Sequence, residues 1–235
     1  GGLLVFYQQV RLHESQADVL RPYNLEKPLW VLLGTSVSRA KGDKSAAAKQ
    51  ERTDVAEVLA FLKRFLEDDA WAIERIDKTL AGESGFADGE TGSDLFQPHL
   101  KHLAGQSAAG LYKRICRDLF HGQGALEVWD IKNSGEIGLR VSSSGHKDLP
   151  YFAVINIGDV PDFLDHVEQT VKLPVKEDRF TGSLFDEISR ATSPIYMLIG
   201  AKKFIEGWSS WRVSSMGLLN VGKGEGSQVI QLFGR

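Results

Sequence analysis

The stretch from Pro194 to Arg235 constrains the fold of this chain most. It opens with the apolar run Ile195–Ile199, whose length suits a fully buried strand, and Gly200 ends that run. After a polar turn, the run Met216–Val221 is typical of a second buried strand. A glycine-rich turn and a short helical segment capped by Ser227 follow. Two buried strands, a polar loop between them and a helix start are typical of the edge of an open α/β sheet, where ligands usually bind.

Strand-like and helix-like segments alternate through the rest of the chain. The apolar runs Leu29–Leu33 and Tyr151–Ile157 predict buried strands, and Leu126–Ile131 with Ile137–Val141 predict a hairpin around residues 133–135. Leu3–Val10 is expected to form a short β-like run. Helices are expected at residues 53–66, 71–80, 95–103, 108–120, 160–167 and 180–191. This order predicts an α/β fold with a mostly parallel sheet and right-handed crossovers.

The same segments divide the chain into two parts. We expect residues 1–28 to be an N-terminal connector and residues 29–235 to form one α/β domain. Residues from about 70 to 124 fit the alternation of strands and helices least well. We therefore interpret them as a helical insertion in that domain.

Composition restricts the compartment and the partners. The single cysteine, Cys116, has no internal disulfide partner, which favours a reducing compartment such as the cytoplasm. No apolar run approaches the roughly 18 residues that a membrane span needs, so we expect no membrane partner. The net charge is −3. Any nucleic-acid binding must therefore come from a local basic strip rather than from the overall charge.

Two motifs near the end of the chain carry a resemblance to a known family. Ile199-Gly200 through Glu206-Gly207-Trp208 resembles motif V of superfamily 2 helicases. Residues 228–235 resemble the first part of motif VI, whose family form is Gln-x-x-Gly-Arg-x-x-Arg; Gln231, Gly234 and Arg235 match it. The order and spacing are those of type III restriction endonuclease subunits and related DEAD/DEAH-type proteins. The close resemblance covers about a sixth of the chain.

This resemblance implies a RecA-like domain of the P-loop NTPase type, with helices on both faces of the sheet. It would be the C-terminal motor half of an ATP-dependent DNA helicase or translocase of a restriction or phage-defence system. Arg235 would be the catalytic arginine that stabilises charge on the γ-phosphate. Glu206, Gly207, Gln231 and Gly234 would shape the nucleotide site. ATP would be the cofactor, with Mg²⁺ held by an N-terminal RecA-like domain of the same parent chain.

The resemblance also implies contacts to the DNA backbone. The position of motif IV, after Leu29–Leu33, places a hydroxyl near a phosphate at Thr35 or Ser36; a strand end that turns through small residues explains them equally well. Gly200, Lys202 and Lys203 are the other expected nucleic-acid contacts. Residues 38–52 are basic and are interpreted as a mobile loop, either solvated or touching DNA. A modification subunit is a further candidate partner.

Four residues with metal-ligand chemistry lie in the expected insertion: His99, His102, Cys116 and His121. Cys116 falls on an apolar helix face, so a core cysteine with surface histidines is favoured over a zinc site. Trp211 and Trp208 are interpreted as core or interface aromatics rather than as base-stacking platforms.

Two other function classes remain open. No GxxxxGK[ST] loop and no DExx sequence after a buried strand occurs, so we expect the chain alone neither to hydrolyse ATP nor to unwind DNA. A stand-alone nucleotide-binding or methyltransferase-like enzyme would use the loop at Gly158-Asp159, although it lacks the GxGxxG fingerprint. Alternatively, the insertion makes the chain a protein-interaction module of a defence complex. Nucleotide titration and deletion of the insertion discriminate these classes.

Overall fold

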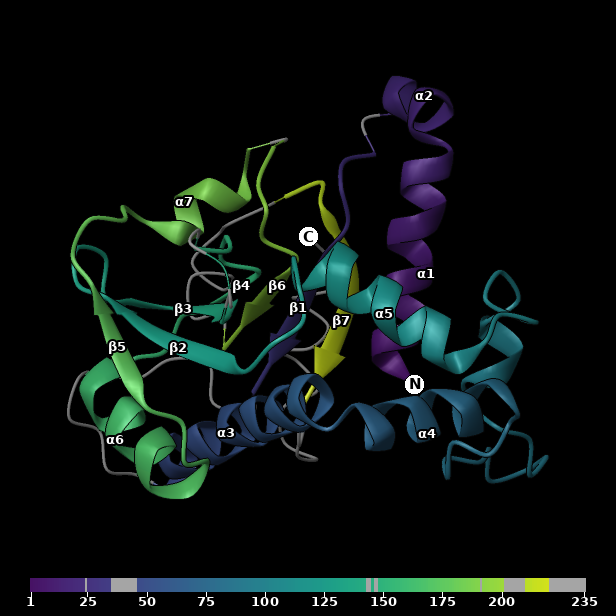
Figure 1. Cartoon of the computed structure of the whole chain (residues 1–235), viewed down its shortest axis with the longest axis horizontal. Helices are drawn as coiled ribbons and strands as arrows, with labels where there is room; N and C mark the ends of the chain where they lie inside the picture. The colour runs from purple at the N-terminus through teal and green to yellow at the C-terminus, as the bar shows by residue number, and fades with distance from the viewer. Residues whose placement is uncertain are drawn as a thin grey trace.

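The computed structural model describes residues 1–23, 25–34, 46–142, 145, 148–190, 192–200 and 210–219, with the backbone alone for residues 21 and 46–53. The predicted fold class is confirmed: the chain is an α/β protein built on a seven-stranded, mostly parallel mixed sheet (Figure 1). The strands are β1 (Leu29–Leu33), β2 (Leu126–Ile131), β3 (Glu136–Val141), β4 (Ala153–Ile155), β5 (Val175–Asp178), β6 (Met197–Ile199) and β7 (Val213–Leu218).

The strands lie side by side in the order β5-β2-β3-β4-β6-β1-β7. The pairs β4–β6, β6–β1, β1–β7 and β2–β5 are parallel, and β3 pairs antiparallel with both β2 and β4. The other six strands of this described sheet therefore run in one direction, and their carboxyl ends meet at one edge. The predicted hairpin is confirmed, because β2 and β3 pair in register from Leu126 with Val141 to Ile131 with Glu136.

Helices cover the two faces of the sheet unequally. A large core joins one face to α3 (Ala46–Glu67), α5 (Ala108–Leu119), α6 (Val160–Thr170), α1 (Gly2–Ser15) and α4 (Asp69–Leu80). A smaller core on the opposite face contains α7 (Leu184–Ile188). Figure 1 shows α1 and α4 beyond the β7 end of the sheet, while α3 and α6, which contact each other, lie below β2 and β5. No helix among the described residues is long and apolar enough to cross a membrane.

The β-like run predicted for Leu3–Val10 is wrong, because these residues lie in helix α1. Leu3, Leu4, Phe6, Tyr7 and Val10 are all buried, a spacing that leaves one helical face apolar. The Phe6 ring stacks on Trp30 of β1 at a centroid distance of 5.6 Å, and the Tyr7 hydroxyl donates to Asp118 on α5. The short α2 (Ala17–Leu20) and a 3₁₀ turn (Arg21–Tyr23) follow.

Helix α3 begins earlier than predicted, at Ala46 rather than at residue 53 or 54. The sequence Ala46-Ala47-Ala48-Lys49-Gln50-Glu51-Arg52 consists of strong helix formers, so the helix continues upstream of the predicted start. The loop interpretation of residues 38–52 is therefore wrong from residue 46 onward. Residues 95–103 likewise form only a 3₁₀ turn, Gln97–His99, with Pro98 inside it.

Other boundaries agree or shift by a few residues. Helices α4, α5 and α6 occur where predicted, and Ser183 caps α7 through a hydrogen bond from the amide of Asp186. Helix α7 is shorter than expected. Strand β7 begins at Val213, three residues before the predicted start, and is only partly buried because it forms the outer edge next to β1. Strand β5 was not predicted.

Candidate functional site

The carboxyl edge of the sheet contains a topological switch point between β4 and β6. From β4 the chain passes through α6 to β5, at one outer edge of the sheet, whereas from β6 it continues to β7, at the other outer edge. Because neighbouring strands depart in opposite directions, no described crossover helix covers the space between their carboxyl ends. Ligands of open α/β sheets bind at such switch points. We therefore take the carboxyl ends of β4, β6 and β1 as the candidate site.

Gly200 lies at the centre of this site. Its φ is +83°, which L side chains rarely adopt, and its amide donates to the carbonyl oxygen of Leu32 at the end of β1. A Cβ atom at Gly200 would lie 2.7 Å from the carbonyl oxygen of Asn156. The position therefore requires glycine on two grounds: backbone conformation and the close approach of the chain after β4.

Asn156 follows β4 directly and is buried, with 9% of its surface exposed. Its backbone N–H donates to the carbonyl oxygen of Ile199, and this hydrogen bond continues the pairing of β4 with β6. Ala153, Ile155 and Ile157 belong to the large core, whereas Val154 belongs to the core on the α7 face. Since strand side chains alternate between faces, the Asn156 side chain belongs to the α7 face.

Two described carboxylates at this edge of the sheet, those of Glu136 and Asp178, are engaged within the protein. Glu136, at the start of β3, is buried and accepts hydrogen bonds from the amides of Leu184 and Phe185 and from the Ser183 hydroxyl. It thereby satisfies donors at the start of α7. A carboxylate bound in this way stabilises a helix end and has few lone pairs left for a ligand.

Asp178, at the end of β5, is similarly enclosed. Its carboxylate accepts from the Tyr151 hydroxyl, the Thr181 hydroxyl and the amides of Phe180 and Thr181. Burial acts to raise the pKa of Asp178, but these hydrogen bonds outweigh it and hold the pKa well below its usual range. Asp178 is thus an ionised structural group that forms the turn after β5.

At the opposite edge of the sheet, where the same strands begin, a buried arginine binds several backbone carbonyls. Arg212 is 1% exposed, and its guanidinium donates to the carbonyl oxygens of Lys27 at 2.9 Å, Ile195 at 2.6 Å and Ile188. Lys27 lies before β1, Ile195 lies before β6, and Ile188 is the last residue of α7. Burial, with a smaller opposing effect of Glu26, lowers the pKa of Arg212 to about 10. One side chain therefore joins three elements at the amino edge.

Two further basic groups bind the segment that leads into β6. The Lys27 ammonium donates to the carbonyl oxygen of Ser193 at 2.7 Å and lies 3.9 Å from the centroid of the Tyr196 ring. His121 Nε2 lies 2.9 Å from the carbonyl oxygen of Pro194 and must carry the hydrogen, since a carbonyl only accepts. With Arg212 on Ile195, three consecutive carbonyls are bound by three basic side chains from different elements. We call Lys27, His121 and Arg212 the basic clamp.

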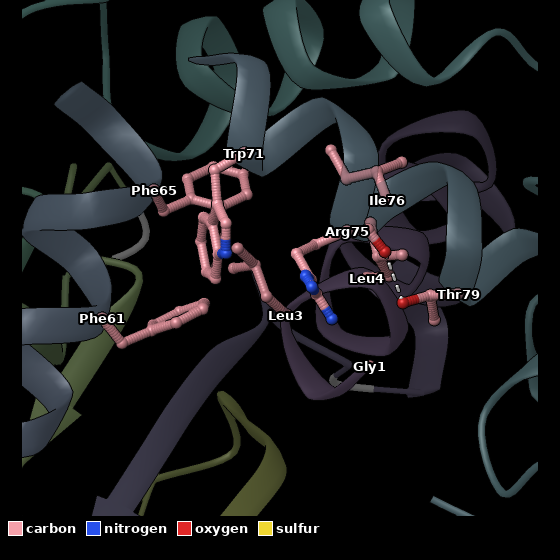
Figure 2. Close-up of a pocket in the computed structure, with 9 residues that line it drawn as sticks. All are labelled: Gly1, Leu3, Leu4, Phe61, Phe65, Trp71, Arg75, Ile76 and Thr79. Carbon is pink, nitrogen blue, oxygen red and sulfur yellow. Dashed lines mark hydrogen bonds between the residues drawn. The ribbon is translucent and has the colours of Figure 1, made fainter. Parts of the chain in front are cut away.

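A small cavity lies between α1, α3 and α4, away from the switch point (Figure 2). Its volume is about 50 Å³, and the rings of Phe61, Phe65 and Trp71 form much of its wall. Figure 2 shows the Arg75 guanidinium beside it and the Thr79 hydroxyl turned back to donate to the carbonyl of Arg75. The polar groups at this cavity are thus few, and one of them is already paired.

The residues considered as zinc ligands do not converge in the structure. Cys116 lies in the large core, and burial raises the pKa of its thiol to about 11, so the prediction of a core cysteine is confirmed. His99 and His102 are exposed, and His121 belongs to the basic clamp. Within the described ranges, no group of three or more candidate ligands comes together. Trp211 is 77% exposed, so it is not a core aromatic, and the alternative interpretation as an interface aromatic stays a prediction.

Gly200 is the one predicted site residue that falls within the described residues, and it lies at the switch point. The remaining predicted residues lie outside them: Thr35, Ser36, Lys202, Lys203, Glu206, Gly207, Gln231, Gly234 and Arg235. Asn156 was missed at the sequence level. A polar residue that interrupts the buried run Tyr151–Ile157 is a signal that could have identified it.

Comparisons of the chain with protein-family models, with curated proteins and with solved structures found no match.

Proposed function

We propose that this chain is the C-terminal motor half of an ATP-dependent DNA helicase or translocase of the restriction type. The motif resemblance supplies the proposal, with Arg235 as the arginine acting on the γ-phosphate and Glu206, Gly207, Gln231 and Gly234 around the nucleotide. The ATP and its Mg²⁺ would be held mainly by an N-terminal RecA-like domain. The protein would act on DNA in a restriction or phage-defence system.

The observation that carries the proposal is the place of Gly200. The motif V resemblance begins at Ile199-Gly200, and in the structure these residues end the central parallel strand β6 at the switch point. A loop that starts there leaves the sheet at the edge where open α/β proteins bind ligands. The strand before the motif and the position of its first two residues, Ile199 and Gly200, are thus compatible with a motif V role.

The test is steady-state ATPase in the parent protein with saturating DNA. Arg235→Ala should lower kcat by roughly 10³-fold or more, because an arginine at the γ-phosphate can contribute 10³–10⁵ in rate. KM should change little, since the ground-state affinity would come from the other domain. Arg235→Lys should rescue poorly, because lysine lacks the planar fork that spans two phosphate oxygens.

A matched control is Arg179→Ala, which removes an exposed arginine paired with Glu177 at 2.8 Å. It should leave kcat unchanged. The isolated chain, without the N-terminal domain, should show no ATPase above buffer. Turnover that co-purifies with the isolated chain, or a near-normal kcat for Arg235→Ala, would contradict the proposal.

A further inference from the structure

We propose that the cavity between α1, α3 and α4 is a binding site for small branched-chain carboxylates. The apolar end of the ligand enters beside the aromatic rings of the cavity, and its carboxylate pairs with Arg75 (Figure 2). The cavity lies away from the switch point, so the site is independent of the proposed motor function. It gives α4, which belongs to the expected helical insertion, a role in ligand binding.

Apolar side chains from three helices form the wall of the cavity. Leu3 and Leu4 of α1, Phe65 of α3 and Ile76 of α4 each expose 5% of their surface or less. Phe61 also lines the cavity and is 39% exposed, so its ring reaches the surface, where the cavity is partly open to solvent. Such a wall removes an aliphatic group from water and offers it no hydrogen bond. It therefore selects a ligand with an apolar end.

The volume of the cavity limits the size of that apolar end. The cavity holds about 50 Å³. An apolar cavity of roughly 150 Å³ holds a benzene ring, so an aromatic ligand is too large to be enclosed here. A compact branched group of about three carbon atoms, such as isopropyl, fits the smaller space. The rest of the ligand then extends through the open side.

A cation lies at the same cavity as this apolar wall. Figure 2 shows the Arg75 guanidinium and the aromatic rings on opposite sides of Leu3. The Arg75 side chain is 52% exposed, and the carboxylate of Glu74 lies 4.0 Å from it. Glu74 already accepts from the Lys78 ammonium at 2.6 Å. Arg75 can therefore donate to an added carboxylate, which a planar guanidinium binds through two parallel hydrogen bonds.

The indole of Trp71 is positioned by two neighbours and reports on the site. The Phe61 ring meets it edge-on at a centroid distance of 6.3 Å, and the Arg64 guanidinium lies 4.4 Å from its centroid. These contacts fix the ring as a wall of the cavity. A ligand that enters beside the ring changes the surroundings of its N–H group, so the Trp71 indole signal is a local measure of binding.

The experiment titrates the isotope-labelled full chain with 3-methylbutanoate and follows the indole N–H signal of Trp71 by NMR. The signal should shift and saturate. 3-Methylbutanamide keeps the shape of the acid without its charge, and should bind about fivefold more weakly. Acetate keeps the charge without the isopropyl group. It should bind at least about tenfold more weakly, because it buries no branched group in the cavity.

The variant Arg75→Gln separates the two parts of the site. It should bind the acid about fivefold more weakly and the amide as wild type does, because only the acid pairs with the guanidinium. The matched control is Arg179→Gln, which removes an exposed arginine directly after β5. It should leave the affinities for both probes unchanged. Circular dichroism should show the same unfolding midpoint for both variants and wild type, since both side chains are exposed.

Three results would overturn the inference. The first is a Trp71 signal that does not shift with 3-methylbutanoate. The second is equal affinity for acid and amide, or an equal loss of both in Arg75→Gln, because Arg75 would then not hold the carboxylate. The third is acetate binding as tightly as 3-methylbutanoate, which would mean an adventitious ion only.

A last probe distinguishes two sources of the same chemistry. A branched group beside a carboxylate occurs in free acids and also in a leucine at the end of a peptide chain. N-acetyl-leucine that binds more tightly than 3-methylbutanoate would assign the ligand to a chain end, and weaker binding would assign it to a free acid. Either order supports a site for branched-chain carboxylates, provided that Arg75→Gln weakens the tighter probe.

Discussion

The two ends of the central strands differ in how their polar groups are satisfied. At the amino edge, the basic clamp binds three consecutive carbonyls, Ser193 to Ile195, and Arg212 also binds the carbonyls of Lys27 and Ile188. At the carboxyl edge, Gly200 keeps a backbone conformation that few residues tolerate, and the Asn156 amide has no partner among the described residues. The same strands β1 and β6 thus end in a dense network of side-chain hydrogen bonds at the amino edge and in a close glycine turn at the carboxyl edge.

This difference indicates which end of the strands does more to stabilise the sheet. Buried polar groups that are fully paired stabilise one arrangement. Changes at the amino edge should therefore alter stability most. Changes at the carboxyl edge should affect binding more than stability, except where the backbone itself is strained.

The largest effect is expected for Arg212→Met. The substitution removes the donors of two buried carbonyls and of one part-buried carbonyl, and each buried acceptor left unpaired costs about 1–3 kcal/mol. Allowing for relaxation, the free energy of unfolding should fall by about 3–5 kcal/mol. Urea unfolding followed by circular dichroism measures it, and failure to obtain folded protein would be the extreme form of the same result.

Arg179→Met is the control for this prediction. Arg179 is exposed and pairs with Glu177 at the surface, so its loss should change the free energy of unfolding by less than about 0.5 kcal/mol. If Arg212→Met cost no more than Arg179→Met, the amino edge would not be the stabilising end, and the comparison of the two edges would fail.

The next effect concerns Gly200→Ala, expected to lower the free energy of unfolding by about 1–3 kcal/mol. Its φ of +83° is unfavourable for alanine, and the new Cβ would lie 2.7 Å from the carbonyl oxygen of Asn156. Gly135→Ala separates the two causes. Gly135 has a similar φ of +64° in the β2–β3 hairpin but no atom within 4 Å of the position of a Cβ.

Thermal unfolding of both variants gives the measurement. Gly135→Ala should show only the conformational cost, about 1 kcal/mol. Gly200→Ala should exceed it, and the excess is the steric cost of separating the chains after β4 and β6. Equal effects would mean that the backbone at the switch point moves apart freely, and the close approach of the two chains would then not require glycine.

The helices and strands in which apolar residues recur at a regular spacing were predictable from the sequence. The elements that were not predicted correctly, α1 and β5, have identifiable causes. The apolar runs of β1 and β6 and the alternation in β2 and β3 gave correct strands. Helix α1 was mistaken for a strand because its first residues, Leu3-Leu4-Val5-Phe6-Tyr7, are continuous apolar residues that fit both periods. Strand β5, Val-Lys-Glu-Asp, carries almost no apolar signal because it is an exposed edge strand.

The candidate site was less predictable than the fold. Gly200 was identified because a glycine ends an apolar run, which is a local pattern. The neighbour that makes glycine necessary, Asn156, is 44 positions away in the sequence and comes close only through the β4–β6 pairing. The basic clamp has the same property, since Lys27, His121 and Arg212 are brought together by three separate elements. No local pattern predicts contacts that depend on strand order.

The smallest effect is a pH dependence of stability from the basic clamp. Burial, followed by the nearby charge of Arg212, lowers the pKa of Lys27 to about 8 from 10.5. Above pH 8 the folded state loses this proton while the unfolded state still binds it, so the free energy of unfolding should rise with pH between about 8 and 10.5. Between pH 7.5 and 9 we expect a gain of about 0.5 kcal/mol, after allowing for solvent screening of a side chain that is only part-buried.

Other groups act in the opposite direction at higher pH, which sets the window for the measurement. Burial raises the pKa of the Cys116 thiol to about 11 and that of Tyr196 to about 12, so both favour unfolding once the unfolded groups ionise, from about pH 9 upward. The rise from Lys27 should therefore be resolved below pH 9 by comparing wild type with Lys27→Met. The N-terminal amine of Gly1, whose pKa burial also lowers, acts in the same direction in both proteins, so the variant should show a smaller rise over the same interval. A rise of equal size in the variant would assign the effect to another group and remove Lys27 from the account of the amino edge.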